Sequence, residues 1–162
     1  MWPFSKKPEL PGLKRTKEGS ISFDITDEEQ QEIDKTYEVL SGLFIRDDIR
    51  DKLKQGLIAR GLANYATDQV IKAKFATDPN SREECMCKAI ASITKAYSIH
   101  SLPIYAYDLA CYLEMANRLD ESKYTFKLFL KHQSDFRPEP LDDILMGERD
   151  ISEPIRHATT KI

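Results

Sequence analysis

The sequence predicts an all-α protein built from antiparallel helical hairpins. Only six of its 162 residues are glycine, which argues against a turn-rich β fold. Apolar residues recur at the three- and four-residue spacing of amphipathic helices through most of residues 25–133. The connection Asn117–Asp120 between two such stretches is short enough to force an antiparallel pair. The length suits one domain with a sizeable core.

Composition narrows the classes of function. The chain is 41% hydrophobic and 31% charged, and its net charge of −3 gives no electrostatic footprint for nucleic acid. No apolar run approaches the roughly 20 residues that span a bilayer, and the N-terminus lacks the apolar core of a secretory signal. Three cysteines at irregular spacing do not form a disulfide framework. We therefore expect a cytoplasmic protein with reduced thiols, no nucleic-acid partner and no transmembrane segment.

Residues 1–24 are interpreted as a flexible basic N-terminal arm. Residues 1–22 hold three prolines, two glycines and five basic against two acidic residues, with no helical or alternating period. The alternative is a peripheral membrane contact through residues 1–17, with Trp2 and Phe4 as interfacial anchors. Five separated charges are fewer than a dense basic cluster supplies, so we expect no such contact.

The first helix is expected to begin at Thr26. Thr26 and Glu29 match a capping box, in which the hydroxyl and the carboxylate each accept a hydrogen bond from the other residue's backbone N–H. An apolar stripe follows at helical spacing. Its members are Ile33, Tyr37, Leu40 and Phe44.

The second helix is expected to start near Asp47. If it continued to Ala76 it would run about 29 residues, which is longer than a typical globular helix. Gly61 or the Thr67–Asp68 pair could divide it in two. Its second half presents small residues that suit close packing of helices. The apolar and small positions are Ile49, Leu53, Leu57, Ala59, Ala63, Ala66, Val70 and Ala73.

Proline and capping residues place the next three helices. Pro79 stops the second helix, and Ser81 with Glu84 matches another capping box, so a third helix is expected from Ser81 to about Ile99. Pro103 lies in the first turn of a fourth helix, and a fifth follows the Asn117–Asp120 connection. Their inward positions are Met86, Ala89, Ile93, Ala96 and Tyr97, then Ala106, Leu109, Ala110 and Leu113, then Ser122, Phe126, Phe129 and Leu130.

Residues 134–162 are interpreted as a C-terminal capping tail. Prolines at 138 and 140 break the fifth helix, and Leu141, Ile144 and Leu145 could form one helical turn. Ser152 and Pro154 indicate a last helix. Such short pieces are stable only when docked, so we expect them to lie along the helical body.

The segment from Ala106 to Leu130 carries small and large residues in a characteristic order. Leu109, Ala110 and Leu113 lie in its first helix, Asn117 and Leu119 at the turn, and Ser122 and Phe126 in its second helix. This order resembles a tetratricopeptide repeat. In that family small residues lie where the two helices approach most closely, and large residues fill the space beside them. Phe129 is larger than the pattern prefers.

A shift of 33 residues extends the resemblance by half a repeat. It aligns Met86, Ala89, Ile93, Ala96 and Tyr97 with Leu119, Ser122, Phe126, Phe129 and Leu130. The same shift maps the first helix of the repeat onto the break at Pro79, so the first half of the preceding repeat is absent. The resemblance implies that residues 25–133 form a short tetratricopeptide-like α-solenoid, with the best repeat at about 102–133. About three repeats are normally needed, so either the upstream helices or a second copy of the chain must complete the stack.

No motif of catalytic, cofactor or metal chemistry emerges. Cys85 and Cys87 are two residues apart in an expected helix, where their side chains point apart, and Cys111 is interpreted as a groove or core residue. His100 and His132 are placed near helix C-termini, where a cation is favourable. His157 has no nucleophile or carboxylate at a recognisable spacing. We therefore expect no enzyme, no cofactor and no metal.

The resemblance implies a protein-binding surface. In the family, the first helix of each repeat lines a concave groove that receives peptides or extended segments. The corresponding residues here are Ile104, Tyr107, Asp108, Cys111, Glu114 and Met115. The alternative is that Tyr107 and Met115 simply pack against neighbouring helices.

The sequence thus favours a protein–protein interaction module, an adaptor or assembly factor that binds a protein or peptide segment. A small substrate-holding chaperone is one alternative. A metal- or thiol-dependent protein that uses Cys85, Cys87 or Cys111 is another. Self-association remains open.

Overall fold

The computed structural model describes residues 13–15, 21–40, 47–139, 142 and 150–162. Within these ranges the chain forms helices α1 (Asp27–Leu40), α2 (Asp47–Phe75), α3 (Pro79–Ile99), α4 (Pro103–Met115), α5 (Leu119–Asp135) and α7 (Ser152–Lys161). Two three-residue strands, β1 (Leu13–Arg15) and β2 (Ile21–Phe23), pair antiparallel within the N-terminal arm. The described body is all-helical, which confirms the predicted fold class at that level.

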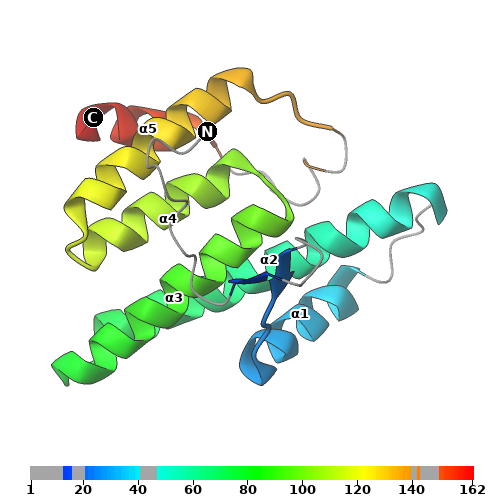
Figure 1. Cartoon of the computed structure of the whole chain (residues 1–162), viewed down its shortest axis with the longest axis horizontal. Coiled ribbons are helices and arrows are strands. Elements are labelled where there is room, and N and C mark those ends of the chain that lie inside the picture. Colours follow the sequence, from blue (N-terminus) through cyan, green and yellow to red (C-terminus); the bar gives the residue numbers. More distant parts are fainter. Residues whose placement is uncertain (1–12, 16–20, 41–46, 140–141, 143–149) are drawn as a thin grey trace.

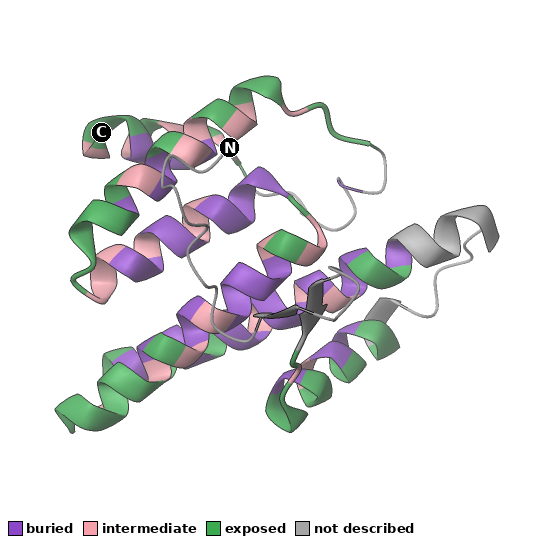
Figure 2. Cartoon of the chain, in the orientation of Figure 1, coloured by how far each residue is buried: buried purple, intermediate pink, exposed green. Residues whose placement is uncertain are grey.

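The helices pack mainly on their neighbours in sequence (Figure 1). Helices α2 and α3 form a long antiparallel hairpin, and α1 packs against α2. The shorter hairpin of α4 and α5 is stacked on the first through contacts between α3 and α4, and α7 lies against α5. Buried residues lie where the two hairpins meet, whereas the ends of α2 and α3 at their connecting turn are mostly exposed (Figure 2).

The capping box at the start of α1 is confirmed. Thr26 N–H donates to Glu29 Oε1 (3.1 Å), and Glu29 N–H donates to Thr26 Oγ1 (3.2 Å). The predicted stripe is wrong at Tyr37, which is 52% exposed. The buried face of α1 instead carries Glu29, Ile33 and Thr36. Phe44 and the side chain of Leu40 lie outside the described residues.

Helix α2 runs without a break for 29 residues, so neither Gly61 nor Thr67–Asp68 divides it. Gly61 instead allows α1 to cross closely. A Cβ atom at this position would lie 2.5 Å from Ile33 Cα and 2.8 Å from Ile33 Cγ1. The small residues of the second half are buried as expected, Ala59 and Ala66 completely. A surface of small side chains therefore brings neighbouring helices into close contact with α2.

The predicted capping box at Ser81 is wrong. Asp78 is the N-cap of α3, and its carboxylate accepts hydrogen bonds from Ser81 N–H (3.2 Å) and Asn80 N–H (3.4 Å). Ser81 Oγ also donates to this carboxylate (3.0 Å). Pro79 occupies the first helical turn, where its missing N–H leaves no bond unmade. The helix therefore begins at Pro79 rather than Ser81.

The Asp78 cap is expected to stabilise α3. Asp78→Ala should lower the free energy of unfolding, because two backbone N–H groups lose their acceptor. Urea denaturation followed by circular dichroism measures the change. Asn80→Ala, which keeps the cap and removes only an exposed side chain, is the control. Equal stability of the Asp78→Ala variant and the wild type would contradict the assignment of this cap.

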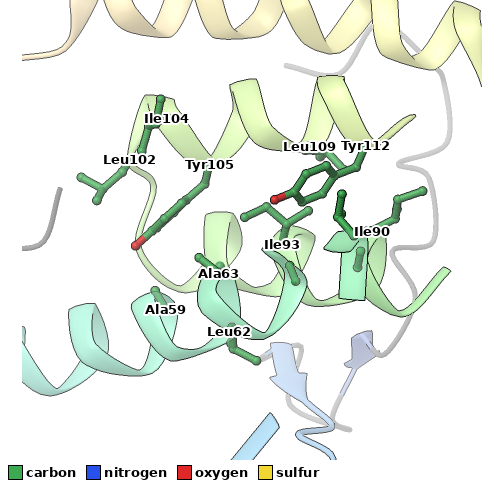
Figure 3. Close-up of a cluster of buried hydrophobic side chains, with 14 of the residues drawn as sticks. Ala59, Leu62, Ala63, Ile90, Ile93, Leu102, Ile104, Tyr105, Leu109 and Tyr112 are labelled. Atoms are coloured by element: carbon green, nitrogen blue, oxygen red, sulfur yellow. The ribbon is translucent and has the colours of Figure 1, made fainter. Parts of the chain in front are cut away.

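The main core lies between α2, α3 and α4. Figure 3 shows Leu102, Tyr105 and Leu109, from α4 and the residue before it, lying over Ile93 of α3 and Ala63 of α2. Tyr105 and Leu102 are each 1% exposed. A second cluster joins α4, α5 and α7 and consists of Ala106, Ala110, Phe126, Phe129 and Ala158, all fully buried. Bulky side chains of α4 thus face α3, while its alanines face α5 and α7.

The C-terminal segment packs on the second hairpin. Helix α7 begins at Ser152, as the sequence predicts, and buries Pro154 and Ala158. Leu141, Ile144 and Leu145 lie outside the described residues, as do Trp2 and Phe4. Asp142 is described, and its Oδ1 lies 2.9 Å from His100 Nε2 at the end of α3.

Candidate interaction surface

The α4–α5 hairpin has the close contact that its sequence pattern predicts. Ser122 Oγ donates to the carbonyl oxygen of Ala110 (2.8 Å), so the two helix backbones approach at a pair of small residues. Phe126, one turn along from Ser122, is completely buried. The turn is tight because Asn117 adopts a left-handed conformation (φ 60°), and Arg118 N–H returns to the carbonyl oxygen of Leu113 (2.9 Å).

The six predicted groove residues do not share one environment. Ile104 is 3% exposed and packs in the main core, so it belongs to the interior. The other five form a half-buried stripe along α4, which we call the α4 stripe; it consists of Tyr107, Asp108, Cys111, Glu114 and Met115. These residues are spaced one to four apart, so they share a broad face of the helix. The stripe mixes apolar, aromatic and acidic groups.

Helix α7 covers part of the α4 stripe. Tyr107 Oη and His157 Nδ1 are hydrogen-bonded at 2.8 Å, and the two rings make an edge contact. Lys161 Nζ donates to Glu114 Oε1 (3.0 Å), with both side chains 35% exposed. Cys111 packs against the same cluster as Ala158. Since His157 pairs with Tyr107 and Lys161 with Glu114, α7 runs in the same direction as α4 (Figure 1).

All three histidines are hydrogen-bonded to another part of the chain. His132 Nδ1 of α5 lies 2.9 Å from Tyr97 Oη of α3, and burial lowers the pKa of His132. His100 pairs with Asp142, and His157 with Tyr107. These contacts link elements distant in sequence, a role beyond the helix-end position that the sequence suggests for His100 and His132.

A buried ion pair that was not predicted from the sequence joins α1 to α3. Lys95 Nζ donates to Glu29 Oε1 (2.7 Å) and to the carbonyl oxygen of Asp24 (2.7 Å). The Ser92 hydroxyl donates to Glu29 Oε2 (2.7 Å) and lies 3.0 Å from the carbonyl oxygen of Leu62. The side chains of Glu29 and Lys95 are only 2% and 6% exposed. One carboxylate therefore connects α1, α3 and the segment before α1.

Burial alone would raise the pKa of the Glu29 carboxyl. The hydrogen bonds from Lys95, Ser92 and the Thr26 N–H outweigh it and hold this pKa below its ordinary value. A cavity of about 340 Å³ adjoins the pair, and Tyr65 and Glu28 line it. Tyr65 Oη donates to Glu28 Oε2 (2.7 Å) there. Glu28, Glu29 and Tyr65 at this cavity are therefore engaged with other protein groups. We interpret the cluster as a structural link between helices.

The cysteines have separate environments. Cys85 is half-buried against the main core and Cys87 is exposed, while Cys111 lies on the α4 stripe. No disulfide joins any two of the three. In the described part of the chain, no three histidine, cysteine, aspartate or glutamate side chains are grouped so that they could hold a metal ion. Of the helices that the structure places, none has the length and apolar character to cross a membrane.

A second apolar surface lies at the free end of the α2–α3 hairpin. Ile71 and Phe75 are one helical turn apart on α2 and are 47% and 83% exposed. Lys72 and Lys74 lie in the same last turn. Exposed apolar patches of this kind often mark interaction sites. The exposure of Phe75 could have been predicted from the sequence, because Phe75 lies outside the small-residue face of α2.

The protein thus has two candidate interaction surfaces, the α4 stripe and the free end of the α2–α3 hairpin. The α4 stripe differs from the other because it already holds a helix. Comparison of the chain with protein-family models, with curated proteins and with solved structures finds no match.

Proposed function

We propose that the protein is a protein–protein interaction module of tetratricopeptide-like type. Its α4–α5 hairpin would bind a peptide or helical segment of another protein along the α4 stripe. One observation carries this proposal: the stripe accommodates a helix of the chain itself through partly exposed polar contacts at Tyr107 and Glu114. Contacts of this kind, at the rim of an apolar centre, are typical of protein interfaces.

The arrangement of α4, α5 and α7 supports a tetratricopeptide-like stacking of helices. In a stack of helical hairpins, the first helices of successive repeats run in the same direction. Helix α7 runs parallel to α4 and packs against α5, which is where the first helix of a further repeat would lie. Terminal helices of such stacks are usually atypical and close the open end. Helix α7 would serve as this cap.

Charge indicates the kind of partner. Asp108 and Glu114 make the α4 stripe acidic, and α7 meets it with Lys161. A partner segment with basic and apolar residues on one face would be complementary. The three cysteines form no disulfide, which suits a reducing compartment and a cytoplasmic site of action.

Site-specific crosslinking tests the proposal. A photoreactive p-benzoylphenylalanine replacing Asp108 or Met115 should crosslink a defined partner in cells of the native host. The matched control carries the same group in place of Asp68, which is exposed on α2. The partner should be captured from positions 108 and 115 and not from 68, and Asp108→Lys should weaken its binding. Equal capture from position 68, or none from the α4 positions, would contradict the proposal. One stoichiometric client would instead favour the chaperone alternative.

A further inference from the structure

Helix α7, which packs on the second hairpin, buries fewer residues than either helix of that hairpin. It has ten residues, and the Asp150 carboxylate just before it accepts a hydrogen bond from the Ser152 N–H (2.9 Å). Only Pro154 and Ala158 are buried, with Ile155, His157 and Lys161 partly buried. A helix of this length is marginal in isolation, so its folding depends on docking. Because undocking removes few buried groups from contact, α7 is expected to open locally at a much lower free energy than the main core.

The surface beneath α7 is better formed than the helix that covers it. Phe126 and Phe129 of α5 are fully buried, and the Tyr107 ring lies 6.0 Å and 5.3 Å from them. Ala106 and Ala110 leave room for a close approach to α4. The Tyr107 hydroxyl and the Glu114 carboxylate lie at the edge. We call this surface, made of Ala106, Ala110, Tyr107, Glu114, Phe126 and Phe129, the α7 seat.

We propose that the α7 seat is where the protein binds its partner, and that the partner supplies an amphipathic helix that replaces α7. This inference rests on the proposed function and specifies its ligand. The partner helix would carry a small residue against Ala106 and Ala110, as Ala158 does. A hydrogen-bonding side chain such as histidine would precede it and face Tyr107. A basic residue about one turn further would face Glu114, as Lys161 does.

The partner helix is expected to compete with α7 for the seat. Without a partner, α7 shields the aromatic surface from water and from nonspecific contacts. While α7 is docked the seat is closed, so apparent affinity is reduced by the fraction of molecules that are closed. A longer partner helix would bury more of the half-buried stripe residues than the ten residues of α7 do.

A labelled peptide of residues 150–162 serves as the probe. Its binding to the full-length chain is measured by fluorescence anisotropy for the wild type, for Ala158→Glu and for Thr159→Glu. Ala158→Glu places a charge in the buried contact and should release α7, whereas Thr159→Glu adds the same charge at the neighbouring exposed position. The peptide should bind Ala158→Glu at least about tenfold more tightly than the other two, because only that chain has an open seat. A peptide that itself carries Ala158→Glu should not bind.

Hydrogen exchange must show that α7 opens in the Ala158→Glu chain while α4 and α5 stay protected. If the hairpin were also lost, the double variant His157→Ala/Lys161→Glu would replace it, since it weakens the edge contacts without burying a charge. An open α7 with no gain in peptide binding would overturn the inference. A dimer formed on mixing Ala158→Glu with wild-type chains would make a second copy the occupant and also overturn it.

The two proposals can fail separately. If a partner crosslinks at position 108 but Ala158→Glu leaves its yield unchanged, the α7 seat is not its site and the proposed function stands. If the peptide binds the open chain but no partner is captured at position 108 or 115, the helix-binding seat stands and the proposed function fails.

Discussion

Glu29→Gln is expected to lower the free energy of unfolding by about 3–5 kcal/mol, because it leaves the Lys95 ammonium buried without its counter-ion. The two side chains are almost fully buried and 2.7 Å apart. Lys95→Met should be comparably destabilising, since the carboxylate then loses its cation. The double variant should be less destabilised than the sum of the single changes, because both buried charges are removed together. Chemical denaturation of the four proteins gives the coupling energy.

The pH dependence of this effect has a defined sign. The folded pKa of Glu29 is lowered from an ordinary value of 4.5, so its contribution is present above about pH 4.5 and is lost as pH falls through the folded pKa. The stability difference between wild type and Glu29→Gln should therefore shrink as the solution is acidified below pH 4.5. Lys88→Met is the control. Its partner Glu84 is 68% exposed, so the change should be at most about 0.5 kcal/mol. A difference that grew on acidification would refute the assignment.

Gly61→Ala is expected to destabilise the protein by about 2–3 kcal/mol, although alanine is the better helix former. At an exposed position in the middle of a helix the same change would add about 1 kcal/mol of stability. The sign reverses here because the new methyl group would lie 2.5 Å from Ile33 Cα. Backbone cannot move aside as the end of a side chain can, so α1 must shift away from α2.

Thermal denaturation and hydrogen exchange of α1 measure this shift. Adding Ile33→Ala should not rescue Gly61→Ala, because the nearest atom is a Cα that every residue has. Full rescue would show that the Ile33 side chain alone sets the contact. Unchanged stability of Gly61→Ala would mean that α1 does not cross α2 at this point.

Features set by neighbouring residues could be predicted from the sequence. The capping box of Thr26 and Glu29, the restart at Pro103 and the turn at Asn117 each depend on a few adjacent residues, and each is present. The predicted start of α3 was wrong because Asp78 and Ser81, three residues apart, are both favourable N-cap residues. A proline is favourable in the first turn of a helix, so Pro79 favours Asp78 as the N-cap as well as ending the preceding helix.

Features that depend on distant residues could not be predicted. Glu29 and Lys95 are 66 positions apart, so no local pattern links them. The available signal was a lysine and a serine, Lys95 and Ser92, on the apolar side of α3, since a charge in such a place needs a partner. The prediction that Tyr37 is buried was wrong for a related reason. Helical spacing alone allows more than one buried face for α1, and the close crossing at Gly61 determines that the face with Ile33 is the buried one.

The small residues on opposite faces of α2 constrain how this chain can change over evolutionary time. A Cβ atom at Gly61 would overlap Ile33, and Ala59 and Ala66 are completely buried, whereas solvent-facing positions of the same helix can vary freely. Divergent descendants of the gene should therefore differ most in charge and least in the spacing of these minimal side chains. A deep mutational scan should show the same asymmetry, with enlargement at these three positions tolerated far less than reversal of charge at exposed ones.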